Sequence, residues 1–79
     1  MDSVISRKGD EARTKAKNIL KAELKRHGVS YKNLAHRLTA RGHKESPRNL
    51  ANKISRGGFT AAFLVQIMEA IGVKEIRLD

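Results

Sequence analysis

The sequence predicts a small all-α domain of four to five helices. Helix-capping residues recur along the chain, apolar residues are spaced three and four apart, and the residue patterns that mark the ends of strands are almost absent. A chain of 79 residues has room for one hydrophobic core, which excludes a multidomain enzyme. Because 39% of its residues are hydrophobic and 32% are charged, we expect it to fold in water rather than remain disordered or insert into a membrane.

The pattern divides the chain into three parts. Residues 1–9 show no helical period and are predicted to be a flexible basic arm. Residues 10–73 carry the helical pattern and form the predicted domain, and residues 74–79 are a C-terminal tail. The first helix is predicted to begin after Asp10, a favourable N-cap, and to end at Gly28. Its apolar stripe consists of Ala12, Ala16, Ile19, Leu20 and Leu24.

Two short helices follow, separated by a turn. The second helix has Ser30 as its N-cap, buries Leu34, Ala35 and Leu38, and is predicted to end near Arg41, before Gly42. Ser46 caps the third helix, in which Pro47 takes the first position, where a missing N–H is harmless. The inward and outward residues of the third helix separate cleanly. Inward lie Leu50, Ala51 and Ile54, and outward lie Arg48, Asn49, Asn52, Lys53 and Arg56, before Gly57 and Gly58 end the helix.

The fourth helix is apolar on nearly every side. It begins after Thr60 and ends at Gly72, and Gln66 and Glu69 are its only polar residues between Ala61 and Ile71. Such a helix is either the central core helix or is covered by a second subunit. In the tail, Ile76 and Leu78 are two residues apart, as in a short extended strand, although a packed irregular tail fits the pattern equally well.

The positive charge is unevenly distributed. The net charge is +9, and 15 of the 17 Lys and Arg residues lie in residues 1–56, together with five of the eight acidic residues. A basic body joined to a nearly neutral apolar end suggests a polyanion-binding surface on one part and a core or partner surface on the other. A basic face that is merely solvated is the alternative.

The order of the elements, a short helix, a turn and a second helix with an exposed basic and amide face, is typical of a helix-turn-helix motif. Residues 24–73 resemble the Cro- and lambda-repressor-like (XRE-type) helix-turn-helix family, including a compact group of its bacterial members. The resemblance is carried by four stretches: Leu24-Lys25-Arg26-His27-Gly28-Val29-Ser30, Leu34-Ala35, Ile54-Ser55-Arg56-Gly57 and Ala70-Ile71-Gly72-Val73. One departure is that residues 39–46 make the turn longer than the three or four residues usual in the family.

The resemblance implies a transcription regulator that binds double-stranded DNA and reads the major groove with the helix formed by residues 47–56. Arg48 suits guanine and Asn49 and Asn52 suit adenine, so these side chains are the expected base readers. The expected phosphate contacts are Ser46, Lys53, Arg56, Lys44, Arg41, Lys32 and Tyr31. Arg7 and Lys8 of the arm are expected to track a groove of the DNA. RNA is a weaker alternative, because Tyr31 alone offers little surface on which unpaired bases could stack.

A homodimer is expected, because one such domain reads only half of a twofold site. The expected dimer or partner contacts are Val65, Met68, Ile76 and Leu78. The apolar excess between Phe59 and Leu78 supports the competing hypothesis of a protein-interaction module, similar to an antitoxin or adaptor, which is built on the same scaffold and uses the helix of residues 61–71 and the tail. The two hypotheses differ in salt dependence, since DNA binding weakens steeply with ionic strength whereas an apolar contact hardly responds.

Enzymatic and metal-dependent functions are not expected. No two of His27, His36 and His43 are four residues apart, the chain has no Cys, and no phosphate loop or nucleophile elbow is present. We therefore expect no cofactor, no metal and no small-molecule ligand. No stretch approaches the roughly 18 apolar residues that a membrane span needs, and a cytoplasmic location is expected.

Overall fold

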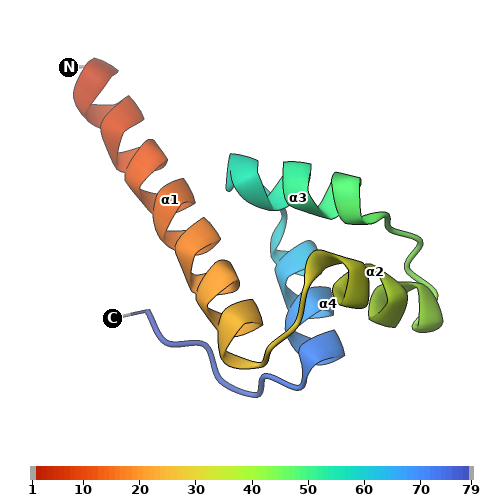
Figure 1. Ribbon diagram of the computed structural model, residues 1–79. Coiled ribbons are helices and arrows are strands. Elements are labelled where there is room, and N and C mark those ends of the chain that lie inside the picture. Colours follow the sequence, from red (N-terminus) through yellow and green to blue (C-terminus); the bar gives the residue numbers. More distant parts are fainter. Residues whose placement is uncertain (1, 79) are drawn as a thin grey trace.

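The computed structural model describes residues 2–78, with side chains from residue 9 to residue 78. Within these residues the chain forms four helices and no strand, in agreement with the predicted all-α class (Figure 1). The helices are α1 (Asp2–Arg26), α2 (Tyr31–Ala40), α3 (Pro47–Arg56) and α4 (Ala61–Ile71). None of them is long and apolar enough to cross a lipid bilayer.

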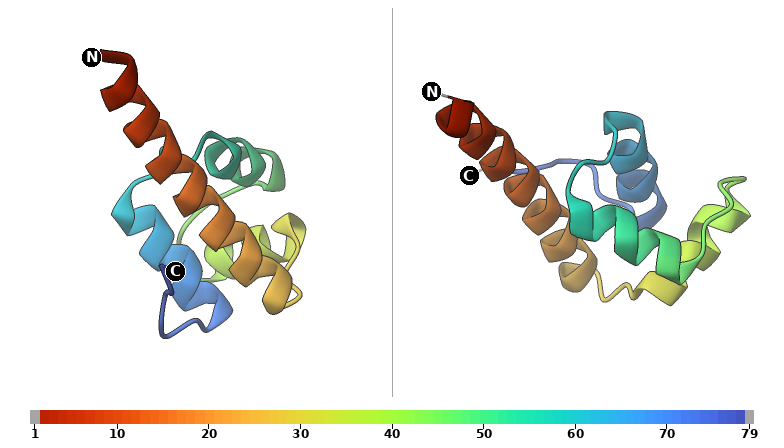
Figure 2. Two further views of the ribbon diagram at one scale, coloured as in Figure 1. Left: turned by 90° about the vertical axis from the view of Figure 1, so that its left-hand side faces the viewer. Right: turned by 90° about the horizontal axis from the view of Figure 1, so that it is seen from above.

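The start of α1 differs from the prediction. The helix begins at Asp2 rather than after Asp10, so the backbone of the expected arm is helical up to and including Gly9. No Pro interrupts this segment, and one Gly inside a helix costs only about 1 kcal/mol relative to Ala. With 25 residues, α1 accounts for much of the 45 Å long axis of the molecule. Its N-terminal turns project beyond the other three helices (Figure 2).

The three shorter helices begin and end close to the predicted residues because their signals are local. At the N-termini, the hydroxyls of Ser30, Ser46 and Thr60 accept hydrogen bonds from backbone N–H groups three residues later, at 3.0–3.1 Å. At the C-terminus of α2, Arg41 is the cap and Gly42 adopts a φ of 89°. Such left-handed residues allow the chain to leave a helix sharply.

A single core joins the helices. It contains Leu20 and Leu24 of α1 and the inner faces of α2, α3 and α4, and Leu20, Leu34, Leu50, Ile54 and Ile67 are fully buried. Of the predicted stripe of α1, Ile19 packs against this core, whereas Ala12 is exposed and Ala16 lies outside the cluster. α2 packs against both α3 and α4, and α1 packs against α3. Ala35 is buried within this cluster, as predicted.

The composition of α4 left two alternatives open, a central core helix or a helix covered by a second subunit. In the structure, α4 is mainly a core helix. Ile67, Met68 and Ile71 are buried, and Phe63 and Leu64 pack against the core while remaining partly exposed. Met68, with 3% of its surface exposed, was an expected dimer contact, and this expectation is wrong because its side chain is used inside the protomer. Val65 is the large apolar residue of α4 that stays exposed.

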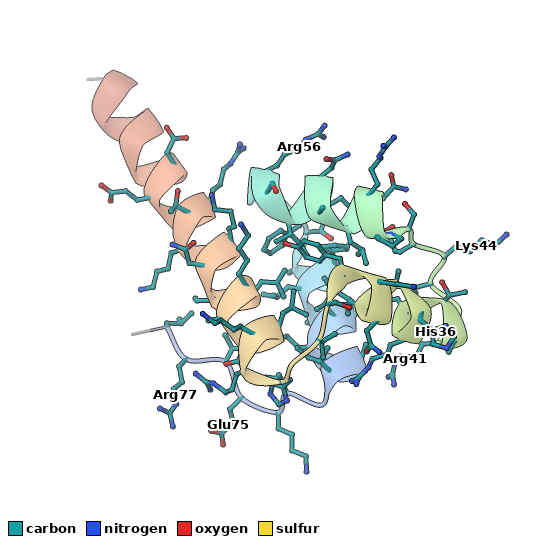
Figure 3. The ribbon with its side chains drawn as sticks, in the orientation of Figure 1. His36, Arg41, Lys44, Arg56, Glu75 and Arg77 are labelled. Carbon is teal, nitrogen blue, oxygen red and sulfur yellow. The ribbon has the colours of Figure 1, made fainter. Side chains whose placement is uncertain are left out.

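The tail after α4 forms no strand over residues 74–78, and residue 79 lies outside the described part. The Val73 N–H donates to the Met68 carbonyl at 2.9 Å, and the Val73 side chain packs against the core. Beyond it, Ile76 and Leu78 are exposed, and Arg77 and Glu75 point outward from the tail (Figure 3). A strand in this segment would need a neighbouring strand to pair with, and the described residues form none. The tail is therefore irregular, as the second alternative had it, but among residues 73–78 only Val73 packs against the core, and residues 74–78 are exposed.

Candidate nucleic-acid interface

α3 presents one apolar face to the core and one polar face to solvent. Leu50 and Ile54 are fully buried, and on the opposite side Arg48, Asn49 and Asn52 are exposed. The three expected base readers therefore share an open helix surface, which α1, α2 and α4 leave uncovered (Figures 1 and 2). A helix of 10 residues is about 15 Å long, which is comparable with the roughly 12 Å width of a DNA major groove.

The long turn between α2 and α3 is held in place by specific contacts. α2 ends at Ala40, so the additional residues lie in the turn and do not lengthen the helix. The His43 N–H donates to the Leu38 carbonyl at 2.8 Å, and the Glu45 carboxylate accepts hydrogen bonds from Lys53 Nζ at 2.7 and 3.1 Å. The turn is thus tied both to the end of α2 and to the middle of α3, which fixes the angle between the two helices.

Lys53 was expected to contact DNA phosphates, but the structure gives it intramolecular partners. Its ammonium group pairs with Glu45, whose side chain is only 11% exposed, and also lies 5.2 Å from the centre of the Phe63 ring. Phe63 in turn stacks at a tilt on Phe59, with ring centres 5.7 Å apart. These contacts join the turn, α3 and α4 around one cation. We therefore assign Lys53 a structural role and leave it out of the proposed phosphate contacts.

Ser46 also has a partner within the chain. Its Oγ accepts a hydrogen bond from the Asn49 N–H at 3.1 Å, so that backbone amide is not available to a phosphate. The Arg48 backbone N–H, in the first turn of α3, has no partner among the hydrogen bonds of the described residues. An anion approaching this helix end would meet the Arg48 amide and side chain together.

The other expected phosphate contacts are not all on one side of the molecule. Lys32 is exposed near the start of α2, whereas Tyr31 packs partly against the core. Lys44 and Arg56 point outward from the turn and from the end of α3, but Arg41 lies below α2, on the side turned away from α3 (Figure 3). The side chains of Arg7 and Lys8 lie outside the described residues. Among these positions, Lys32, Lys44 and Arg56 fit a surface centred on α3 best.

Two sets of polar contacts that position the helices were not among the predicted features. Arg37 donates from Nε to Asn33 Oδ1 at 2.6 Å and from a terminal nitrogen to the Ala70 carbonyl at 3.3 Å, which joins α2 to the end of α4. Glu23 is buried and pairs with Arg26 at 3.1 Å and with His27 at 3.6 Å. Helix spacing alone indicates the Glu23 pairs, but the Arg37 contact depends on the tertiary arrangement.

α1 contributes cations beside the end of α3. Arg13, Lys17 and Arg56 line a small polar groove of about 200 Å³, together with Asp10 and Thr14. Neither Arg13 nor Lys17 was among the binding residues predicted from the sequence. No pattern in the sequence could place either residue next to Arg56, because the rotation of α1 about its axis is set by core packing.

Comparison with curated proteins found no match, and comparison with solved structures found none either. A family model described as a domain of unknown function (DUF6471) matches residues 12–76, from near the middle of α1 to the tail. This range includes α2, the turn, α3 and α4 in full. Because the match covers most of its length, the chain belongs to the DUF6471 family.

Proposed function

We propose that the protein binds double-stranded DNA in a sequence-specific manner, with α3 in the major groove, and acts as a transcription regulator. The observation that carries this proposal is the outer face of α3, where Arg48, Asn49 and Asn52 are exposed opposite the buried Leu50 and Ile54. Arg offers a forked donor pair to guanine O6 and N7, and Asn pairs with adenine N6 and N7. A rigid helix that carries both residue types suits direct base reading.

The support around α3 agrees with this proposal. α2 packs beneath α3, and the Glu45–Lys53 pair fixes the turn between them, so α3 has a defined angle relative to the body. This arrangement fits the role of the bracing helix in a helix-turn-helix motif, and the resemblance of residues 24–73 to the Cro- and lambda-repressor-like family supports the same interpretation. The net charge of +9 favours approach to a polyanion.

We favour DNA binding over a protein-interaction module for a specific reason. The module hypothesis rests on the apolar excess of residues 59–78, and most of that excess is used in the core, where Ile67, Met68 and Ile71 are buried. Three large apolar residues of this region remain exposed: Val65 at 51%, Ile76 at 38% and Leu78 at 65%. In our proposal they are the contacts of a homodimer that reads two half-sites.

The test is a selection from random DNA duplexes with the purified protein, carried out at two salt concentrations. The proposal predicts an enriched motif whose recovery falls as salt rises, because each neutralised phosphate releases about one counterion. A twofold-symmetric motif would support the dimer as well. Failure to enrich any motif, together with no retardation of duplex DNA in dilute buffer, would overturn the proposal.

A further inference from the structure

We propose that Arg13 and Lys17 of α1, together with Arg56 of α3, form a binding site for a phosphate of the DNA backbone next to the major groove that α3 enters. This inference rests on the proposed function and extends it, because it gives α1 a direct part in binding DNA. Two of the three residues lie outside the helix-turn-helix segment.

The site exists because α1 runs unusually close to the end of α3. A Cβ atom at Gly57 would lie 2.5 Å from the backbone carbonyl oxygen of Arg13 and 3.0 Å from its carbonyl carbon. At Gly58, a Cβ would lie 3.6–3.7 Å from the Arg13 guanidinium, so this side chain extends along the glycine pair. The Arg13 cation is thereby held beside the last turn of α3, where Arg56 projects outward (Figure 3).

The three cations have no carboxylate within ion-pair distance among the described residues, where the ion pairs involve Glu23 and Glu45 only. They face one groove of about 200 Å³ whose exposed lining is mainly polar, and Asp10 is the one acid there. Three positive charges and one negative charge leave a local excess of two. Like charges gathered in this way repel one another, and an anion placed between them removes the repulsion.

The position along α3 identifies the anion. A helix about 15 Å long that lies in a groove about 12 Å wide brings its ends close to the phosphates on either side. The C-terminal end of a helix carries a partial negative charge and would repel a phosphate. Arg56 alone would have to offset that repulsion, whereas Arg13 and Lys17 add two cations at the same place. The groove is therefore best matched by a phosphodiester of the DNA strand that flanks the reading helix.

The experiment compares two double variants, each of which replaces one Arg and one Lys by Gln. Arg13→Gln/Lys17→Gln removes the site, and Lys15→Gln/Arg77→Gln removes one Lys and one Arg that line a different groove, on another face of α1. Figure 3 shows Arg77 on the opposite side of the molecule from Arg56. The measurement is the dissociation constant for the selected duplex, by fluorescence anisotropy, over a series of KCl concentrations. Far-UV circular dichroism and thermal melting establish that each variant is folded.

The inference predicts that the first variant loses about one unit of the slope of log K against log salt, because one phosphate contact is lost, and binds roughly tenfold more weakly at 0.1 M salt. Arg13→Lys should keep most of the slope, because it keeps the charge. If Arg13→Gln/Lys17→Gln is unstable, Lys17→Gln alone should lower the slope by a fraction of one unit, whereas Lys15→Gln alone should leave it unchanged.

Equal slopes for the two double variants would overturn the inference while leaving the proposed function intact, since the charges would then act only through the net charge. Wild-type slopes in Arg13→Gln/Lys17→Gln would overturn it as well. Absence of duplex binding by the wild-type protein would instead refute the proposed function, and the inference with it.

Discussion

The backbone carbonyl of Arg13 in α1 occupies the space in which a side chain at Gly57 would begin, with 2.5 Å between the Arg13 oxygen and an ideal Cβ at Gly57. Gly57 also has a φ of 68° and is the C-cap of α3. Gly57 thus ends α3 and also allows α1 to pack closely against the end of α3.

Replacing Gly57 with Ala should destabilise the protein by about 2–4 kcal/mol. A left-handed φ costs a non-glycine residue about 1 kcal/mol, and the clash with the Arg13 backbone adds to that cost because backbone cannot rotate away. The measurement is the free energy of unfolding from urea denaturation. Gly28→Ala is a matched control, since Gly28 has a φ of 65° and open space around it, and it should cost only about 1 kcal/mol. Equal losses for the two variants would contradict the close approach of α1 and α3.

The Glu45–Lys53 pair should contribute about 0.5–1 kcal/mol to stability. The distance of 2.7 Å and the burial of Glu45 favour the pair, but Lys53 is 49% exposed and solvent screens part of the attraction. A double-mutant cycle with Glu45→Gln and Lys53→Gln measures the coupling energy directly. The coupling should shrink in 1 M salt. A coupling near zero in dilute buffer would mean that the turn is held by its backbone contacts alone.

If α3 reads bases, Arg48→Ala and Asn52→Ala should reduce discrimination between the selected duplex and a mismatched one by about 1–3 kcal/mol. Lys44→Ala is the comparison, because Lys44 is exposed on the turn and should weaken binding to all duplexes by a similar factor. Competition binding with a panel of single-base-pair variants checks both expectations. Uniform weakening by all three substitutions would show that α3 contacts only the DNA backbone.

Val65 and Met68 should respond differently to truncation, although they lie within one turn of α4. Met68→Ala should cost about 2–5 kcal/mol of stability, because Met68 is buried in the core. Val65→Ser should change the stability of the protomer by no more than about 0.5 kcal/mol, because Val65 is exposed. If Val65 lies in a dimer interface, the serine should raise the dimer dissociation constant in light scattering or sedimentation. A wild-type protein that stays monomeric at high concentration would exclude the dimer.

The sequence predicted those parts of the fold that depend on local chemistry. The bounds of α2, α3 and α4 follow from Ser30, Ser46, Pro47, Thr60 and Gly72, each of which acts within one turn of its own position. The start of α1 was missed because Asp10 is a favourable cap that the chain does not use: the residues before it are compatible with helix, and the helix continues.

The candidate site was predicted only in part, since the missing information is tertiary. The exposed face of α3 follows from helical spacing, so Arg48, Asn49 and Asn52 were placed correctly on the solvent side. The pairing of Lys53 with Glu45 depends on how the turn folds back, and the grouping of Arg13 with Arg56 depends on where α1 crosses α3. No spacing in the sequence encodes either of these relationships.

The core holds α3 through very few of its side chains, since Leu50 and Ile54 are the buried ones among its 10 residues. Substitutions on the outer face would therefore leave the scaffold almost unchanged. The same body could carry differently composed outer faces, so that members of the family could acquire distinct binding preferences through a few exposed replacements, each at little cost in folding.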